Sequence, residues 1–257
     1  MKTMDLFNLK GKTAIVTGGA VGLGRQMALG LAETGADIVV CSRKIETCEE
    51  MGRQIESLGV RTLALQCDLT LAEDVDQVVK KTLKDFGKID ILVNNAGRTW
   101  GAPVEELKVG DWKKVIDLNI TGTFQFTQRV GKEMIRQREG KIINISSYAG
   151  LMGTDPEYLN AIAYNTSKGA LISFTKDLAV KWARYGIQVN AIAPGWFVTE
   201  MTKWVTEHHR EKMMDRLLIK RYGGEEDLKG AIVFLASKAS DYMTGHILCV
   251  DGGLTAW

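Results

Sequence analysis

Short apolar runs alternate with amphipathic stretches along this 257-residue chain. Strands that are apolar on both faces must be buried on both faces, and strand–helix–strand repetition imposes right-handed crossovers. The sequence therefore predicts an α/β fold, a Rossmann-like, doubly wound parallel sheet of about seven strands with helices on both faces. The runs rich in β-branched residues that predict strands are Thr13–Thr17, Asp37–Cys41, Thr62–Cys67, Ile89–Val93, Lys141–Ile145, Gln188–Ile192 and Ile247–Val250.

Segments of helical periodicity separate these runs. Five of them end close to a glycine, which suits a helix C-terminus because glycine adopts a left-handed backbone without strain. No linker or repeat divides the chain, so we expect one domain over residues 1–257. The predicted helices are Gly24–Thr34, Glu46–Ser57, Ala72–Phe86, Asp111–Arg138 and Tyr164–Tyr185, with Gly35, Gly59, Gly87, Gly140 and Gly186 as their stops.

Charge and cysteine content argue against several classes of protein. Basic and acidic side chains, 33 and 31 of them, are interspersed and give a formal charge of +2, which favours a small-molecule partner over nucleic acid or a membrane. No apolar run approaches the ~20 residues of a membrane span and the N-terminus lacks a signal-peptide pattern, so we expect a cytoplasmic protein. We also expect reduced thiols and no bound metal, because neither disulfide nor metal spacing relates Cys41, Cys48, Cys67 and Cys249.

A glycine-rich turn joins the first predicted strand to the first predicted helix. Its sequence, Thr-Gly-Gly-Ala-Val-Gly-Leu-Gly at 17–24, places backbone N–H groups and a helix N-terminus where a pyrophosphate can bind. Gly18 would allow the tight turn, Gly22 the close approach of a phosphate and Gly24 close helix packing. Such a turn can also be purely structural, but its place between strand and helix favours a dinucleotide.

The end of the second strand bears on which dinucleotide binds. In dinucleotide folds a carboxylate there accepts the ribose 2′-hydroxyl of NAD, whereas an arginine accommodates the 2′-phosphate of NADP. This chain has Ser42 and Arg43 there and no acid, which favours NADP(H) over NAD(H). The alternative is that Arg43 is a solvated surface residue.

Tyr164 and Lys168 lie one turn apart on the same side of a predicted helix. A phenol with a pKa of about 10 can transfer a proton near neutral pH if its phenolate is stabilised, for example by an ammonium group. Such pairs also occur by chance, so their surroundings decide. Asn-Asn-Ala-Gly at 94–97 and Ser-Ser at 146–147 follow the fourth and fifth strands, at the edge where ligands collect in open α/β sheets.

Together these motifs resemble the short-chain dehydrogenase/reductase family over essentially the whole chain. The resemblance implies an NAD(P)-dependent oxidoreductase in which Tyr164 is the general acid/base and Lys168 lowers its pKa and holds the ribose. It also implies that Ser147, favoured over Ser146, hydrogen-bonds the substrate oxygen and that Asn119 steadies a water relay. The matches are Thr-Gly-x-x-x-Gly-x-Gly at 17–24, Asn-Asn-Ala-Gly at 94–97, Asn119, Ser147, Tyr-x-x-x-Lys at 164–168 and Pro-Gly-x-x-x-Thr at 194–199.

The same resemblance implies further cofactor contacts. Asp68 would meet the adenine, Asn95 and Gly97 the middle of the cofactor, and Thr199 its nicotinamide end. The alternative for Asp68 and Asn95 is a structural role in loops or caps. By family analogy we also expect a homotetramer. The predicted cofactor-binding residues are Gly18, Gly22, Leu23, Gly24, Ser42, Arg43, Asp68, Leu69, Asn95, Ala96, Gly97, Tyr164, Lys168, Pro194, Gly195, Phe197 and Thr199.

Three segments of the last third resemble the gluconate 5-dehydrogenase-like branch of the family: Trp-Ala-Arg-Tyr-Gly at 182–186, Ala-Pro-Gly-Trp at 193–196 and the C-terminus from Val250. This implies interconversion of a secondary alcohol and a ketone on a sugar acid, a polyol or a similar small carbonyl compound. Loops at about 148–163 and 195–222 would form the substrate walls. The alternatives are a 3-oxoacyl thioester reductase and, more remotely, a non-catalytic dinucleotide-binding module.

Two features depart from the family pattern. Sixteen residues separate Ser147 from Tyr164, several more than is usual, which bears on the substrate. Val21 stands where many NADP-preferring members have a basic residue, which bears on the cofactor. Three aromatic residues near the substrate loops, Trp100, Tyr158 and Trp204, suit either a substrate wall or an interface or core position.

Overall fold

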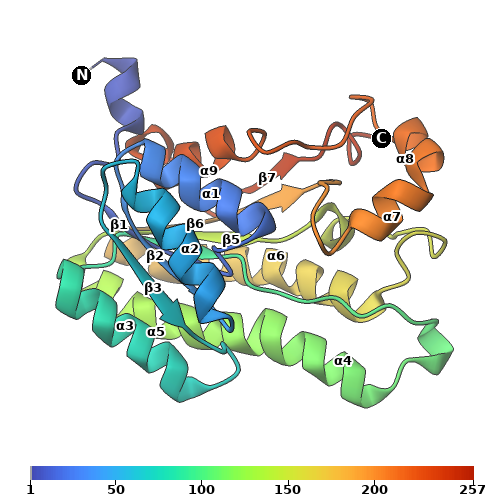
Figure 1. The fold of residues 1–257 in the computed structure, drawn as a ribbon, viewed down its shortest axis with the longest axis horizontal. Coiled ribbons are helices and arrows are strands. Elements are labelled where there is room, and N and C mark those ends of the chain that lie inside the picture. The colour runs from blue at the N-terminus through green and yellow to red at the C-terminus, as the bar shows by residue number, and fades with distance from the viewer. Residues whose placement is uncertain (1) are drawn as a thin grey trace.

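A seven-stranded parallel sheet forms the centre of the fold (Figure 1). The computed structural model describes residues 2–257. Its strands lie in the spatial order β3-β2-β1-β4-β5-β6-β7, and every neighbouring pair is parallel, as predicted. The strands are β1 (Thr13–Thr17), β2 (Asp37–Ser42), β3 (Thr62–Gln66), β4 (Ile91–Asn94), β5 (Gly140–Ile145), β6 (Ile187–Pro194) and β7 (Ile247–Val250).

Helices cover both faces of this sheet (Figure 1). One layer consists of α1 (Gly22–Glu33), α2 (Ile45–Glu56) and α9 (Lys229–Ala236), and the other of α3 (Ala72–Phe86), α5 (Thr123–Gln137) and α6 (Ile162–Trp182). Successive strand residues point to opposite faces, so Val16 joins the first core while Ile15 joins the second. The doubly wound α/β prediction is therefore confirmed.

The strand order reverses at β1, which lies between β2 and β4. In an open α/β sheet the crevice beyond the carboxyl ends of two such strands is the usual ligand site, because the connecting segments there diverge. Three short helices lie towards this end of the molecule, on the right of Figure 1. They are α4 (Val109–Ile116), α7 (Lys203–His208) and α8 (Arg210–Arg216), and the last two fall within the predicted substrate segment 195–222.

The prediction for one helix needs correction at two points. The helix expected over 111–138 begins at Val109 and is interrupted by a π-helical segment, Asp117–Gly122, between α4 and α5. Gly140 is not its stop, because Arg138 takes the left-handed conformation with a φ of 61°. Gly140 instead begins β5, where a Cβ atom would lie 2.5 Å from the sulfur of Met134. The remaining predicted stops do have positive φ, namely Gly35, Gly59, Gly87 and Gly186.

Other boundaries shift by a few residues. Helix α1 begins at Gly22 rather than Gly24, and β4 begins at Ile91 rather than Ile89. The later start of β4 has a local cause, since the preceding Asp90 turns its carboxylate to the N–H of Thr13. Along residues 2–257, no helix is at once long and apolar enough to cross a bilayer.

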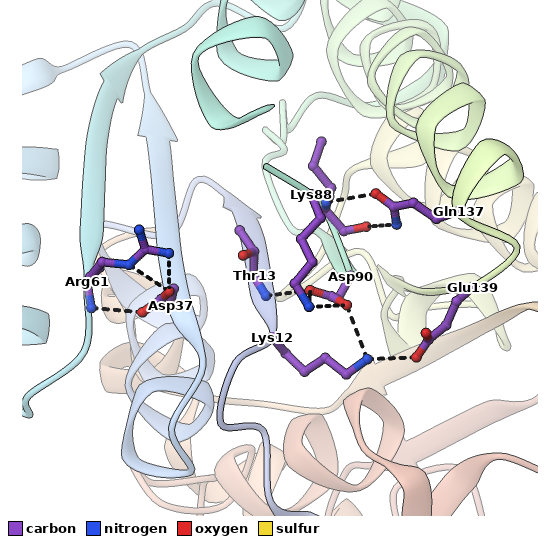
Figure 2. A network of polar contacts seen from close by, with 9 residues as sticks. Lys12, Thr13, Asp37, Arg61, Lys88, Asp90, Gln137 and Glu139 are labelled. Carbon is purple, nitrogen blue, oxygen red and sulfur yellow. Dashed lines mark hydrogen bonds and ion pairs between the residues drawn. The ribbon is translucent and has the colours of Figure 1, made fainter. Parts of the chain in front are cut away.

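Ion pairs and hydrogen bonds gather at the amino edge of the sheet, where the strands begin (Figure 2). Asp90 accepts from Nζ of Lys12 and of Lys88, each at 3.1 Å, and from the N–H of Thr13 at 2.8 Å. Lys12 also reaches Glu139, 2.7 Å away. The network thereby joins the starts of β1, β4 and β5, opposite the edge where a ligand would bind.

Candidate active site

The glycine-rich turn has the conformation that its sequence predicts. Gly18 and Gly22 have φ of 61° and 53°, in the region that favours glycine. A Cβ atom at Gly24 would clash with the carbonyl oxygen of Gly18. No side chain caps the N-terminus of α1, so its first N–H groups remain open to an anion.

Hydrogen bonds join this turn to the residues that follow β4. The hydroxyl of Thr17 accepts from the N–H groups of Asn95 and Ala96, at 3.0 and 3.1 Å. The amide of Asn95 donates in return to the carbonyls of Thr17 and Gly18, both at 3.0 Å. Asn95 thus shapes the turn, which is the structural role that the sequence offers as the alternative to cofactor binding. The sequence did not lead us to predict a site role for Thr17, although a hydroxyl at the end of an otherwise apolar strand indicates one.

Tyr164, Lys168 and Ser147 meet beside the turn, where α6 passes the end of β5. Lys168 is only 4% exposed; its Nζ lies 5.5 Å from the ring centre of Tyr164 and donates to the carbonyl of Ile145 at 2.6 Å. The hydroxyl of Ser147 accepts from the N–H of Ala149 at 3.2 Å and acts to lower the pKa of the Tyr164 phenol. Ser146 points the other way and donates to the carbonyl of Lys168 at 2.7 Å.

The π-helical segment places Asn119 behind this group. Segments of this kind are rare and often mark functional sites, because the wider turn redirects a side chain. The side chain of Asn119 pairs with the backbone N–H and carbonyl of Arg98, at 2.9 and 3.0 Å, and donates to Ser167 at 2.9 Å. A Cβ atom at Gly97 would lie 3.2 Å from Asn119 Oδ1 and 3.7 Å from Lys168 Nζ. The four predicted catalytic residues therefore lie together.

Burial sets the electrostatics of the pair. Burial raises the pKa of Tyr164, and the hydrogen bond with Ser147 offsets only part of the rise. Burial also lowers the pKa of Lys168 to about 8. The sequence led us to expect a lowered phenol pKa, but in the protein alone the cost of burying a phenolate dominates. Both groups are thus displaced towards their neutral forms.

Ser42, Arg43 and Asp68 lie at the ends of β2 and β3, where an adenosine would extend. The hydroxyl of Ser42 is engaged by the backbone of Lys44, whereas Arg43 is exposed. Burial acts to raise the pKa of Asp68, but hydrogen bonds from Thr70 and the charge of Arg43 lower it overall. Asp68 therefore closes a turn with Thr70 and lies close enough to Arg43 to feel its charge.

The segment after β6 faces the glycine-rich turn. Thr199 hydrogen-bonds Thr202, and its methyl group would lie 3.5 Å from a Cβ atom at Gly22. Gly195 donates to the carbonyl of Val250 at 3.0 Å, directly after Pro194, the last residue of β6. Packing explains the other predicted residues of this set: Phe197 and Leu69 are buried, and Leu23 packs on the first core.

The three aromatic residues of uncertain role separate in the structure. The ring of Tyr158 lies edge-on to Trp196, with centres 6.2 Å apart, within the cluster that contains Tyr164. Trp204 is 62% exposed and stacks on His208. Trp100 is also exposed, with Nζ of Lys114 6.0 Å from its ring centre. Only Tyr158 therefore belongs to the wall beside Tyr164.

These elements fit a dinucleotide cofactor. The turn carries no side chain at Gly18, Gly22 and Gly24, the N-terminus of α1 has no side-chain cap, and a buried ammonium lies near Gly97. The carboxyl edge thus combines an anion cradle with a phenol and a hydroxyl. This arrangement suits hydride chemistry at a carbonyl carbon more than hydrolysis, which would use a nucleophile with its own base.

Comparison with known proteins agrees with the geometry. A family model described as short chain dehydrogenase matches residues 12–210. The chain is 39% identical to 5-keto-D-gluconate 5-reductase of Escherichia coli, over 97% of this chain and 98% of that protein. It is 41% identical to a 3-oxoacyl-[acyl-carrier-protein] reductase of Synechocystis, over 96% and 98%.

A solved structure shares the whole fold. The gluconate 5-dehydrogenase of Burkholderia cenocepacia, in complex with NADP and tartrate, superposes with a TM-score of 0.94 at 36% identity, each chain being covered completely. The shared fold, the match to the family model and the two relatives of about 40% identity point to the same conclusion. This chain belongs to the short chain dehydrogenase family.

Proposed function

We propose that this protein interconverts a ketone and a secondary alcohol on a sugar acid, using NADP(H). The observation that carries the proposal is the meeting of Tyr164, Ser147, Lys168 and Asn119 beside an open glycine-rich turn. The cofactor, when bound, supplies or accepts the hydride. The chain's own residues bind the substrate oxygen and move the proton.

Tyr164 is the proposed proton donor in the reducing direction. Burial raises its pKa, so the phenol is protonated and ready to donate near neutral pH. Ser147 lies beside it and would hold the substrate oxygen with its hydroxyl. Lys168, close to the phenol ring, would stabilise the phenolate left after transfer. Asn119 holds the loop at Arg98 and is proposed to steady the waters that return the proton.

The preference for NADP(H) rests on Arg43. Arg43 is exposed at the adenosine end, where its charge acts on Asp68, so a 2′-phosphate could pair with its guanidinium. The bound NADP of the Burkholderia relative supports this choice. With Arg43→Ala we expect kcat/KM for NADPH to fall about tenfold while that for NADH stays within about twofold, because only the phosphate contact is lost. Lys44→Ala is the matched control, and equal losses with both cofactors would argue for NAD(H) or for no preference.

The substrate assignment rests on the relatives named for keto-gluconate chemistry and on a wall that mixes aromatic and polar groups. The test is a comparison of kcat/KM for 5-keto-D-gluconate, 2-keto-3-deoxy-D-gluconate and an acetoacetyl thioester, each with NADPH. We expect a keto sugar acid to exceed the thioester by at least about tenfold, the scale of one well-placed charged contact.

Reduction of a 3-oxoacyl thioester is the second candidate, favoured by the Synechocystis relative. It would be adopted if the thioester were the best substrate in the same panel. A protein that bound NADPH but reduced none of these compounds would instead indicate a non-catalytic dinucleotide-binding module.

We also propose a cytoplasmic homotetramer. The four cysteines are free thiols, which suits a reducing compartment. Apolar side chains on the outer surfaces of α5 and α6, Phe124 and Val180, are 48% and 80% exposed in one chain and would be covered by a second copy. Light scattering of the purified protein, with Val180→Glu as the variant, tests the assembly.

A further inference from the structure

A small cavity lies within the cluster of side chains that contains Tyr164, and residues of α8 form part of its wall. Its volume is about 20 Å³, room for one water molecule. Its walls come from the turn after β5, the loop that follows, the residue after Gly195 and the end of α8. Aromatic and apolar side chains form part of the lining, but Tyr148, Asp155 and Arg216 also contribute to it.

Tyr148 brings an unpartnered hydroxyl to this cavity. The residue is only 5% exposed, and its hydroxyl has no hydrogen-bond partner among residues 2–257. Its ring is fixed against Trp196, with ring centres 5.4 Å apart. Buried hydroxyls are normally paired, so an unpaired one at a cavity wall indicates a ligand or water as its partner. Burial raises the pKa of Tyr148, so the group is a neutral donor.

Arg216, an exposed residue, brings a positive charge to the rim of this cavity. It is the last residue of α8 and lines the same cavity. In the part of the chain that the structure describes, its guanidinium takes part in no ion pair or hydrogen bond. Lys212, one turn earlier on α8, is by contrast paired with Glu157 of the long loop. Arg216 is therefore a cation that remains available to a ligand at this cavity.

We propose that Arg216 and Tyr148 form the subsite that selects a carboxylate at the far end of the substrate. Arg216 binds the carboxylate as a bidentate pair, and the Tyr148 hydroxyl donates to an oxygen of the same substrate. Asp155 lines the cavity as well and would accept a substrate hydroxyl while repelling a second acid. The subsite therefore suits a polyhydroxylated monocarboxylate. This inference rests on the proposed function and names how its substrate class is recognised.

The size of the cavity implies that α8 moves outward when the substrate enters. The helix has seven residues, and both partners of its ion pair with the long loop are exposed. An exposed pair of this kind is a weak restraint. The longer segment between Ser147 and Tyr164 thus has a role, since it supplies Tyr148, Asp155 and the partner of Lys212.

The test compares a charged and a neutral ketone. We would measure kcat and KM with NADPH for 5-keto-D-gluconate and for uncharged 5-keto-D-fructose. Arg216→Gln should raise KM for the keto acid at least about tenfold, with kcat and the KM for the neutral ketone within about threefold, since one charged contact is lost. Arg216→Lys should recover part of the loss, because the charge remains.

Two more variants complete the design. Tyr148→Phe should raise KM for both ketones by a similar factor, because the lost contact is a hydrogen bond and not a charge. Arg210→Gln removes an equal charge from the same helix, but Arg210 lies over the ring of Tyr222, and both KM values should stay unchanged. Melting temperatures would check that each variant is folded.

The outcomes separate the two levels of the proposal. If the wild-type protein reduces keto sugar acids and Arg216→Gln affects both ketones equally or neither, the subsite is overturned while the proposed function stands. If the wild-type protein reduces no keto sugar acid, the proposed function and the subsite both fall.

Discussion

The two edges of the sheet use polar groups in opposite ways. At the amino edge, Asp90 is held by two lysines and a backbone N–H, so its buried charge is balanced (Figure 2). At the carboxyl edge, Lys168 is buried with only a carbonyl as its partner, and the Tyr148 hydroxyl has none among the described residues. Polar groups at the amino edge hold the strands together, whereas polar groups at the carboxyl edge remain available to a ligand.

This difference teaches where stability and activity can be separated. Polar groups left without full compensation destabilise the fold, and such groups concentrate where a ligand completes them. Replacing residues at the carboxyl edge should therefore change turnover with little or even favourable effect on stability. Replacing residues at the amino edge should do the reverse.

The largest effect is expected for Tyr164→Phe. Loss of the hydroxyl removes the proton donor, and kcat should fall by about 10²–10⁴-fold, the range for general acid catalysis. The variant should melt close to the wild-type temperature, because the lost hydrogen bond with Ser147 is offset by the removal of a buried hydroxyl. Near-normal turnover would remove Tyr164 from the chemistry.

Next comes Asp90→Ala at the opposite edge. The change leaves two lysines and the N–H of Thr13 without their shared acceptor, and we expect a loss of about 2–3 kcal/mol in the free energy of unfolding, below the value for fully buried pairs because the lysines are partly exposed. Denaturant titration measures the loss, and kcat/KM of the folded enzyme should stay within about twofold of wild type. A drop in kcat/KM without a loss of stability would contradict the claim that the amino edge serves stability rather than activity.

Lys168→Met should stabilise the cofactor-free protein. Burial lowers the pKa of Lys168 to about 8 from the ordinary 10.5 of a lysine, so below pH 8 the folded protein must bear a buried charge. The unfolded chain binds the proton more tightly, hence wild-type stability rises with pH between 8 and 10.5. We expect the variant to be about 1–2 kcal/mol more stable at pH 7, part of the gain being lost with the unpaired carbonyl of Ile145.

The stability difference for Lys168→Met should shrink as pH rises through this window, and chemical denaturation at several pH values would measure it. Lys181→Met, which removes an exposed lysine from the same helix, is the control and should show no such trend. A stability difference that is independent of pH would mean that burial does not lower the pKa of Lys168 in the folded protein.

The smallest effect is expected for Arg61→Met. Arg61 pairs with Asp37 at 2.7 Å and covers the ring of Phe86, but its side chain is largely exposed. An exposed pair contributes about 0.5–1 kcal/mol, and the aliphatic part of Met keeps some of the contact. Thermal denaturation should show a decrease of a few degrees at most, with unchanged activity. A loss as large as that of Asp90→Ala would mean that the amino edge acts as one cooperative network.

Sequence periodicity was sufficient for the parallel sheet, because alternation of buried strands and helices admits few topologies. The glycine-rich turn, Tyr164, Lys168 and Ser147 were predictable because each lies in a motif with a fixed place relative to a strand end. What the sequence could not supply depends on contacts distant in the chain. The π-helical turn at Asn119 has no local signature, and neither does the free hydroxyl of Tyr148.

Two further features show the same limit. Arg138 ends α5 in a conformation that usually selects glycine, whereas Gly140, two residues later, makes room for Met134. Arg216 looks like any surface arginine in the sequence, and only its position at the cavity distinguishes it. Local chemistry thus predicts the turn and the proton donor, and tertiary packing decides what surrounds them.

The most direct measurement is the reduction of 5-keto-D-gluconate with NADPH deuterated at the transferred position. The label follows the hydride, and the Tyr164→Phe variant tests the proton donor. Wild-type protein should give one deuterium on the new carbinol carbon for each NADPH consumed. Tyr164→Phe should slow deuterium transfer and NADPH consumption by at least about 100-fold. An unlabelled alcohol, or equal rates for the two proteins, would contradict hydride transfer at the carboxyl edge with Tyr164 as the proton donor.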